Sequence, residues 1–432
     1  MRKIGVAGLG KLGLPMALLF DKRGWFDVVA YDADSERIEI LGDATQGGPM
    51  VSFEPEVDQM LWDCTDIIFT SEAHELAKQA ETVFVVVPTP SLSDGRFDSS
   101  MVCDVARQVG RSWALSRQWE YPVLVVCSTV MPGACEGEIR AALEEGGLTV
   151  GVDVGLSYSP EFIALGSVVH DLKHPNFALI GGDSHRSGVR VLEIYDQLYF
   201  HKVPSRFMSL VDAEIAKLSI NMYLSTKVAF ANTLARICEG IPGADATEVV
   251  DALGLDPRIG RSFLTPAVPA GGPCLPRDVV AFDALGPVAS HLTMVSWGAE
   301  GAFLEWLMGA ITRHIKLELD PGFSFHVGIL GLAYKSGSDV TDKALGTYLA
   351  DVFGREKAQQ NMGIRVAWHD PLIYREPFAR RAYEVQVGSQ ILVVTSDDQS
   401  YSWAPTKGQV VIDLWGICEP GDGILIQPGV GP

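Results

Sequence analysis

The stretch KIGVAGLGKLG near the start of the chain restricts the possible folds more than any other feature. Its glycines Gly8, Gly10 and Gly13 follow an apolar, strand-like run and open a helix-like one. In a strand–turn–helix unit the first glycine permits the tight turn, the second lets the backbone approach a pyrophosphate, and the third allows close helix packing. Asp32 ends the next strand-like run, about 20 residues further on, where an acid binds a ribose 2′-hydroxyl. The unit predicts a parallel sheet that binds NAD rather than NADP, because an acid there repels a 2′-phosphate. A glycine-rich turn without a ligand is the alternative.

Short β-branched runs alternate with helix-length polar stretches as far as about residue 205, which predicts a doubly wound sheet. From 211 to 240 the apolar residues recur at helical spacing and Gly240 follows as a stop signal, so one long helix is expected. It is expected to connect domains and to offer a dimer surface. Further helical sequence extends to about 318. The strand-like runs of the first part are KIGVAGL, DVVAYD, TVFVVVPTP, PVLVVCSTV, LTVGVDVGLSYSP and FALIGG.

A second α/β unit begins near Phe323, with the runs FHVGILGL, IRVAWHDP, QILVVTSDD and QVVIDLW. The tail GICEPGDGILIQPGVGP is rich in Gly and Pro and is expected to be irregular. No repeat of fixed period is found. The predicted fold class is α/β, with two Rossmann-like doubly wound domains joined by a long central helix and a helical dimerisation domain. The expected domains are 1–205, 206–318 and 319–432.

The composition excludes several classes of function. A formal net charge of −20 argues against nucleic acid and anionic membranes as partners, since phosphate binding needs clustered Lys and Arg. No run reaches the roughly 20 apolar residues that a membrane span needs, and Lys11 interrupts what would otherwise resemble a signal peptide. Seven cysteines without a CxxC pair fit a reduced, cytoplasmic chain without a zinc ribbon.

Polar side chains follow three of the predicted strands. Thr89 lies in PTP, Ser128 and Thr129 lie in CSTVMPG, and Glu161 lies in YSPEF. Because the carboxyl ends of such strands face the ligand crevice, Ser128 and Thr129 are placed to bond a ligand or water, with helix capping as the alternative. A carboxylate such as Glu161 can act as a base toward water.

Two further stretches carry candidate chemistry. On the predicted long helix Lys217 and Asn221 lie four residues apart, on one face and among apolar residues, unless that face is a solvated stripe. In GGPCLPRD, Cys274 sits in a glycine-rich loop whose N–H groups favour a thiolate, and Asp278 can orient a neighbouring base. An inert loop thiol is the alternative, whereas the other six cysteines are expected to be small core residues.

His170 and His174 have the spacing of metal ligands, but Pro175 and the absence of an HExxH-like set argue against a metal site.

The chain resembles the UDP-glucose/GDP-mannose dehydrogenase family, the nucleotide-sugar 6-dehydrogenases. The resemblance covers nearly the whole length and rests on motifs in the order of the family: GLGKLGLP, VPTP, STVMPG, SPEFIALG, AEIAKLSINMY, DPRIG, GGPCLPRD and GLAYKSG. It implies an N-terminal NAD-binding domain, a central dimerisation domain and a C-terminal domain that shapes the nucleotide-sugar site. It also implies a role in polysaccharide biosynthesis, a homodimer or higher homo-oligomer, and UDP-glucose as the default substrate.

The resemblance implies that Cys274 is the nucleophile in a four-electron oxidation of a sugar CH2OH to a carboxylate by two NAD. Lys217 and Asn221 would stabilise the developing oxyanion, and Thr129, Glu161 and Asp278 would handle water and protons. Arg258 would reach the substrate of a neighbouring subunit. The implied cofactor-binding residues are Gly8, Gly10, Lys11, Leu12, Gly13, Asp32, Thr89 and Thr129. The implied substrate-binding residues are Glu161, Phe162, Lys217, Asn221, Arg258, Phe263, Gly271, Tyr334 and Lys335.

Several positions depart from the usual pattern of the family. The sequence Pro269-Ala270 precedes the cysteine loop where an aromatic residue is usual, and Arg277 replaces a lysine. The stretch SGSDVTDKALG after Lys335 lacks the usual arginine, while Phe177 and Leu165 replace residues that are often charged. Two alternatives stay open. One is a two-electron hydroxyacid-type dehydrogenase, against which the retained cysteine loop weighs. The other is a non-catalytic nucleotide-sugar-binding protein, which the missing arginine favours.

Overall fold

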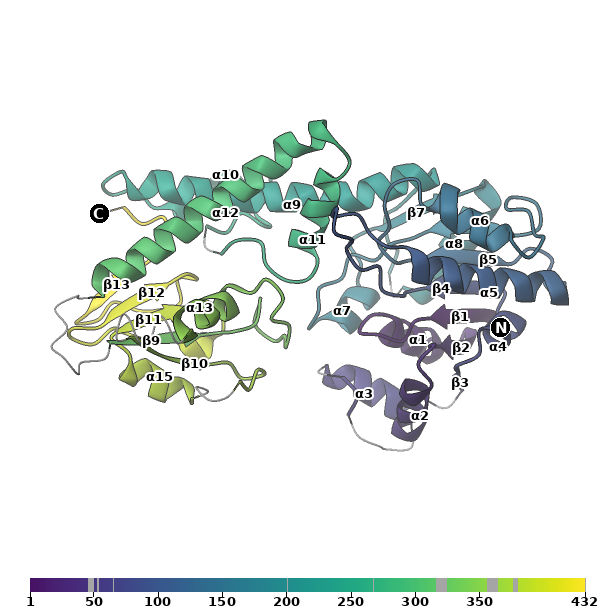
Figure 1. Ribbon diagram of the computed structural model, residues 1–432, viewed down its shortest axis with the longest axis horizontal. Helices are drawn as coiled ribbons and strands as arrows, with labels where there is room; N and C mark the ends of the chain where they lie inside the picture. The colour runs from purple at the N-terminus through teal and green to yellow at the C-terminus, as the bar shows by residue number, and fades with distance from the viewer. Residues whose placement is uncertain are drawn as a thin grey trace. The chain divides into compact units, whose positions relative to one another are not determined.

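The chain divides into two compact units, residues Met1–Ser219 and Ile220–Pro432 (Figure 1). The computed structural model describes residues 1–45, 50–52, 54–64, 66–199, 201–266, 268–315, 325–355, 364–375 and 380–431. The boundary between the two units, after Ser219, falls inside the long helix α9 (Leu210–Glu239). Each end of this helix lies within one residue of its predicted limit. The division into three domains stays a prediction.

The first unit contains an eight-stranded sheet in the order β3-β2-β1-β4-β5-β6-β7-β8. All neighbouring strands are parallel except β6 and β7, which run antiparallel. The chain builds the sheet outward from β1 to β3 on one side and from β4 onward on the other, so the strand order reverses between β1 and β4. Such a reversal is a topological switch point, where doubly wound sheets bind ligands. The strands are β1 (Arg2–Ala7), β2 (Phe26–Tyr31), β3 (Ile68–Thr70), β4 (Thr82–Val85), β5 (Val123–Val126), β6 (Gly155–Tyr158), β7 (Ala178–Gly182) and β8 (Ser205–Met208).

Helices cover both faces of this sheet because its strands are apolar on both sides. In β5, Val123 and Val125 pack with α1, α3, α7 and α8, whereas Leu124 and Val126 pack with α4, α5 and α6. The helices are α1 (Gly13–Lys22), α2 (Ser35–Ala44), α3 (Pro55–Trp62), α4 (Ala73–Gln79), α5 (Ser100–Ser116), the π-helical turn η1 (Cys135–Ile139), α6 (Arg140–Glu144), α7 (Val168–Lys173) and α8 (His185–Leu198).

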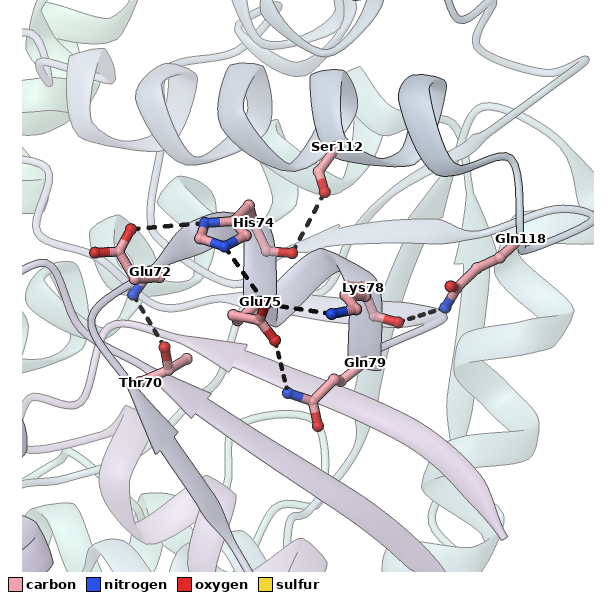
Figure 2. A network of polar contacts seen from close by, with 8 residues as sticks. All are labelled: Thr70, Glu72, His74, Glu75, Lys78, Gln79, Ser112 and Gln118. Atoms are coloured by element: carbon pink, nitrogen blue, oxygen red, sulfur yellow. Dashed lines mark hydrogen bonds and ion pairs between the residues drawn. The ribbon is translucent and has the colours of Figure 1, made fainter.

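Figure 2 shows a network of polar contacts within α4 and between α4 and the segment that contains α5. Glu75 accepts hydrogen bonds from Lys78 at 3.4 Å and Gln79 at 3.3 Å, and the Gln118 side chain donates to the carbonyl of Lys78. Ser112 donates to the carbonyl of His74 at 3.3 Å. Exposed pairs of this kind contribute roughly 0.2–1 kcal/mol each to stability. We therefore interpret the network as structural support for α4, not as a catalytic site.

The second unit contains a five-stranded, all-parallel sheet in the order β10-β9-β11-β12-β13. Helices α12 and α13 pack on one face of it and α15 on the other. The strands are β9 (Phe325–Leu330), β10 (Ile364–His369), β11 (Ile391–Val394), β12 (Val410–Asp413) and β13 (Ile424–Ile426). The helices are α10 (Ala246–Gly254), α11 (Leu275–Asp283), α12 (Pro287–His314), α13 (Leu345–Gly354), α15 (Ala382–Gly388) and the 3-10 turn η2 (Gln399–Tyr401).

The prediction of an irregular tail is wrong at β13. This short strand pairs with β12 through Ile424, Leu425 and Ile426. Beyond it, Gly429 accepts a hydrogen bond from the N–H of Ala246 at 2.9 Å, which fastens the tail to the start of α10. The predicted α/β class is confirmed, with two Rossmann-like sheets and a long central helix. Within the described residues, none of the helices combines the length and the apolar character that a bilayer span requires.

The turn after β9 reproduces the turn after β1. Gly8 donates its N–H to Tyr31 O at 2.8 Å, and Gly331 donates its N–H to His369 O at 2.9 Å. A side chain on Gly13 would meet the carbonyl of Gly8, and one on Gly346 would meet the carbonyl of Gly331. The two units therefore share a supersecondary frame that the sequence did not reveal as a repeat.

Candidate active site

The glycines of the first turn have the roles expected for a dinucleotide. Gly8 has a φ of 94°, and a Cβ there would lie 2.5 Å from Val86 O. A Cβ on Gly13 would collide with the Gly8 carbonyl, so close packing requires glycine at this position. At Gly10 a Cβ would meet nothing within 4 Å, which leaves open space in front of the backbone. The turn therefore fits a pyrophosphate at the N-terminus of α1.

Asp32 is held at the end of β2 by two backbone groups. One carboxylate oxygen accepts from Leu9 N at 2.8 Å and the other from Asp34 N at 3.0 Å. Arg37 donates to Leu9 O at 2.7 Å, so the same loop is held from both sides. The negative charge of Asp32 is thus fixed beside the glycine turn, where it suits a ribose 2′-hydroxyl and opposes a 2′-phosphate.

The loops after β4 and β5 are tied together at the switch point. The Thr89 hydroxyl donates to Thr129 O at 2.7 Å, and the Ser128 hydroxyl donates to Val87 O at 2.7 Å. Buried Glu214, at the start of α9, accepts from Gly133 N at 2.5 Å and Cys135 N at 2.8 Å. The STVMPG loop is therefore held by the same helix that carries Lys217.

Glu161 lies just after β6 in surroundings that disfavour its charge. Burial raises the pKa of Glu161 to about 7, against opposing contributions from the Tyr195 hydroxyl and the Lys217 ammonium. Tyr195 lies 3.2 Å from the Glu161 carboxyl oxygen Oε1. A carboxyl that titrates near neutral pH is suited to accept and release protons.

Lys217 and Asn221 are both buried, with exposed fractions of 8% and 9%, so the solvated-stripe alternative is wrong. The Lys217 ammonium donates to Glu161 O at 2.7 Å and lies 4.3 Å from the ring centroid of Phe162. Within the first unit the structure thus brings together Glu161, Phe162 and Lys217. The Phe162 ring also packs on Phe177, with centroids 4.7 Å apart.

In the second unit Asn221 binds Asp278. The Asn221 side-chain amide donates to Asp278 Oδ2 at 2.5 Å, and Arg277 Nε lies 3.6 Å from Asp278 Oδ1. Asp278 is buried, at 2% exposed. A buried carboxylate that is both hydrogen-bonded and paired holds a fixed orientation.

Cys274 is the exposed member of the seven free cysteines, and the other six are buried, as expected for core residues. It stands at the N-terminus of α11, where the helix dipole favours negative charge. The loop before it packs on Tyr334: Gly272, at φ 84°, has no room for a side chain beside that ring, and its N–H donates to Asp342 O at 3.1 Å. Burial and then the neighbouring Cys274 raise the pKa of Tyr334 to about 12.

The remaining predicted residues lie at more open positions. Arg258 is exposed and folds back on Asp256, with 2.6 Å between Nη2 and Oδ2. Phe263 is partly exposed and has a φ of 63°, a conformation that costs a non-glycine residue free energy and is often found at functional sites. Gly271 lies against Lys343 O, and Lys335 is partly buried in the same loop as Tyr334. Lys11 and Leu12 lie in the glycine turn.

His170 and His174 lie with ring centroids 5.2 Å apart. In the described part of the chain there is no group of three or more potential ligands that is arranged to hold a metal ion.

Sequence reasoning missed three polar side chains that support the predicted site residues. Tyr195 contacts Glu161, Ser159 contacts Tyr195, and Glu214 accepts hydrogen bonds from the loop after β5. Glu214 carries a signal in the sequence, because it stands beside apolar residues on a helix only three residues before Lys217. Ser159 and Tyr195 are 36 residues apart and no motif links them.

Two family models match the chain. The NAD binding domain of the UDP-glucose/GDP-mannose dehydrogenase family matches residues 2–199, and the central domain of that family matches residues 211–295. The GDP-mannose 6-dehydrogenase of Azotobacter vinelandii is 30% identical over 78% of this chain and 75% of its own length. A putative UDP-glucose 6-dehydrogenase of Bacillus subtilis is 31% identical over 65% of this chain, and the match spans 62% of that relative.

The fold is also that of a solved structure. A UDP-glucose dehydrogenase from the archaeon Pyrobaculum islandicum superposes with a TM-score of 0.84 at 26% identity, covering 99% of this chain and 97% of that one. The geometry of the glycine turn and Asp32 is consistent with the NAD-binding domain that the first family model describes. The resemblance drawn from the motifs is confirmed: the chain belongs to the UDP-glucose/GDP-mannose dehydrogenase family and is an NAD-dependent oxidoreductase of that family.

Proposed function

We propose that this protein oxidises the C6 hydroxymethyl group of a nucleotide sugar to a carboxylate, with Cys274 as covalent nucleophile and UDP-glucose as the default substrate. The observation that carries the proposal is the placement of Cys274, an exposed thiol at a helix N-terminus beside buried Asp278 and its partner Asn221. UDP-glucose is favoured because relatives named UDP-glucose dehydrogenase recur among the similar proteins.

The chemistry proceeds in balanced steps. NAD, when bound, would be held by the glycine turn and Asp32 and would supply the hydride acceptor for both oxidations. In the first oxidation the sugar carbon would lose its hydride and a base would take the hydroxyl proton, which gives an aldehyde. The Cys274 thiolate would add to the aldehyde carbon, and the resulting thiohemiacetal alkoxide would lose a hydride in the second oxidation to form a thioester. Water attacks the thioester carbon, the C–S bond breaks, and the thiolate is regenerated with a carboxylate. Covalent capture divides a difficult oxidation into easier steps.

The other buried polar groups fit supporting roles. Lys217 and Asn221 supply the N–H donors that would stabilise the oxyanion of the thiohemiacetal, a contribution of typically about 3 kcal/mol for each donor. Glu161, with a pKa near 7, would accept the proton of the attacking water. Asp278 would orient Asn221, and Thr129 would bind water at the end of β5.

The number of NADH formed per sugar tests the proposal. Purified protein would be incubated with NAD and a panel of UDP-, GDP- and dTDP-sugars, alongside Cys274→Ser and a matched control, Cys418→Ser, whose thiol is buried. Two NADH per sugar with one panel member, and loss of that stoichiometry only in Cys274→Ser, is the expected result. One NADH per sugar, unaffected by Cys274→Ser, would favour a two-electron dehydrogenase. Sugar binding without NADH would favour a binding protein.

We also propose that a second copy of the chain covers an apolar stripe on α9. Tyr223, Phe230 and Ile237 follow one another at seven-residue spacing, which keeps them on one side of the helix, and all three are exposed in the single chain. Apolar rows of this kind mark protein interfaces. Because all seven cysteines are free, we propose a reducing compartment, the cytoplasm, for the protein.

A further inference from the structure

Three oxygen atoms form a chain behind the carboxyl group of Glu161. The Tyr195 hydroxyl lies 3.2 Å from Glu161 Oε1 and 2.9 Å from the Ser159 hydroxyl oxygen. The Ser159 hydroxyl in turn lies 3.0 Å from Leu179 O. Tyr195 and Ser159 are both buried, at 2% and 1% exposed, so the link between their hydroxyls is shielded from bulk water. Neither side chain has a place in the proposed reaction so far.

The number of available hydrogens limits how many hydrogen bonds this chain of oxygen atoms can form at once. Its three links, from Glu161 to Tyr195, from Tyr195 to Ser159, and from Ser159 to Leu179, need three hydrogens, but the hydroxyls of Tyr195 and Ser159 supply only two. The Tyr199 hydroxyl also contacts Tyr195, and it uses its own hydrogen for that additional link. When Glu161 is a carboxylate, one link must lack a hydrogen and two oxygens face each other. When Glu161 carries a proton, its hydroxyl donates to Tyr195, Tyr195 donates to Ser159, and Ser159 donates to the carbonyl. All three links are then complete.

We propose that Ser159 and Tyr195 are positioning residues that form a hydroxyl chain whose hydrogen count is complete only when Glu161 is protonated. The inference rests on the proposed function, in which Glu161 takes a proton from the water that attacks the thioester. Ser159 stabilises the protonated product of that step by accepting the Tyr195 hydrogen, and Tyr195 turns that hydrogen back to the carboxylate when the proton leaves. No proton is transferred along the chain, because each hydroxyl keeps its own hydrogen and only rotates.

Other groups also face Glu161 and bear on its titration. The Lys217 ammonium, on α9, favours the carboxylate. The Cys127 thiol follows β5, and the Tyr199 hydroxyl lies beyond α8 next to Tyr195, with ring centroids 4.9 Å apart. Burial, and then the Glu161 carboxylate, raise the pKa of both Cys127 and Tyr199, which therefore stay neutral around pH 7. Their charge does not change while Glu161 titrates.

The two members of the chain have opposite effects when they are removed. Tyr195→Phe deletes the donor to the carboxylate, and a hydrogen bond to a charged acceptor is about twice as strong as one between neutral groups. The titration midpoint of Glu161 is expected to rise by about one pH unit. Ser159→Ala deletes the link that only the protonated state completes, so the midpoint is expected to fall by about half a unit.

Infrared titration of the purified protein measures this midpoint directly. The carbonyl stretching band of the protonated Glu161 carboxyl is identified as the band lost in Glu161→Gln. The matched control is Tyr158→Phe, because Tyr158 is a fully buried phenol on β6 that packs in the core on the other face of the sheet. The expected result is an upward shift in Tyr195→Phe, a downward shift in Ser159→Ala and no shift in the control.

The outcomes separate this inference from the proposed function. Shifts of the same sign in both variants, or an unmoved midpoint in Tyr195→Phe, would overturn the hydroxyl chain. Opposite infrared shifts, together with matching shifts in the acid limb of the pH profile of kcat/KM, would support both the hydroxyl chain and the role of Glu161 as the base. Opposite infrared shifts without any displacement of that limb would support the chain and refute the proposed role of Glu161 as the base.

Discussion

Replacing Glu214 by alanine tests how the loop after β5 is held. The buried carboxylate of Glu214 accepts the backbone N–H groups of Gly133 at 2.5 Å and Cys135 at 2.8 Å. Alanine leaves both donors without this acceptor, the Cys135 N–H at a buried position and the Gly133 N–H at a partly buried one. Each unsatisfied buried group costs roughly 1–3 kcal/mol. Glu214→Ala is therefore expected to lower the free energy of unfolding by about 2–6 kcal/mol.

The effect has a defined dependence on pH. Burial raises the pKa of Glu214, while the two backbone hydrogen bonds oppose this rise. A carboxyl whose pKa is raised by folding contributes stability below its unfolded pKa, and that contribution is lost as the pH rises through the folded pKa. The alanine variant lacks this titration. The difference in the free energy of unfolding between wild type and Glu214→Ala is therefore expected to narrow as the pH rises from the pKa of an unfolded glutamate to the raised pKa of folded Glu214.

Urea denaturation across this pH range measures the gap, and Glu136→Ala is the matched control. Glu136 is a neighbouring glutamate whose side chain is exposed, so its removal leaves no buried donor unsatisfied. Glu214→Gln keeps one carbonyl acceptor and is expected to fall between alanine and wild type. If Glu214→Ala were as stable as Glu136→Ala, or if the gap widened with rising pH, the account of this carboxylate would be refuted.

Three further predictions concern the cofactor, the base and the dimer. Gly10→Ala has room for its methyl group and is expected to fold normally but to bind NAD at least tenfold more weakly, whereas Gly13→Ala meets the Gly8 carbonyl and is expected to lose stability as well. Calorimetric titration with NAD and thermal melting distinguish the two, and normal NAD affinity in Gly10→Ala would contradict the assignment of the turn. Because Glu161 must be ionised to accept a proton and its pKa is about 7, kcat/KM is expected to fall about tenfold per pH unit below that value. A pH profile checks this, and an unchanged acid limb in Glu161→Gln would exclude Glu161. Phe230→Glu places a charge in the apolar stripe and is expected to shift the protein toward the monomer in sedimentation equilibrium, whereas an unaltered dimer would locate the interface elsewhere.

Local pattern predicted the secondary structure well where the elements are long or strongly apolar. Helix α9 ends within one residue of its predicted limits because its apolar spacing persists over many turns. Strand β13 was missed because it is three residues long and flanked by Gly and Pro, so no period is visible. The antiparallel pairing of β6 with β7 was also beyond reach, because a buried strand has the same composition in either direction.

The candidate site was predictable only where a motif carried it. The glycine turn with Asp32 and the cysteine loop are encoded by residues that are close in sequence. The burial of Lys217 could be expected from its apolar neighbours, but not its bond to the carbonyl of Glu161. Ser159 and Tyr195 meet only through tertiary packing of α8 on the sheet, and neither residue type is unusual in its own segment. Their pairing cannot be read from one sequence.

The glycine turns after β1 and β9 share the same backbone contacts but differ in the length of the segment between their paired glycines. Between its paired glycines the first copy has the four residues 9–12, and the second has the fourteen residues 332–345. In the first copy the space in front of Gly10 is left open for a ligand. In the second, the longer insert extends to the cysteine loop, where Tyr334 and Asp342 brace Gly272. The insert that follows β9 thus connects the C-terminal sheet to the loop before Cys274. A substitution that shifts β9 against α13 is therefore expected to displace Cys274 without contacting it.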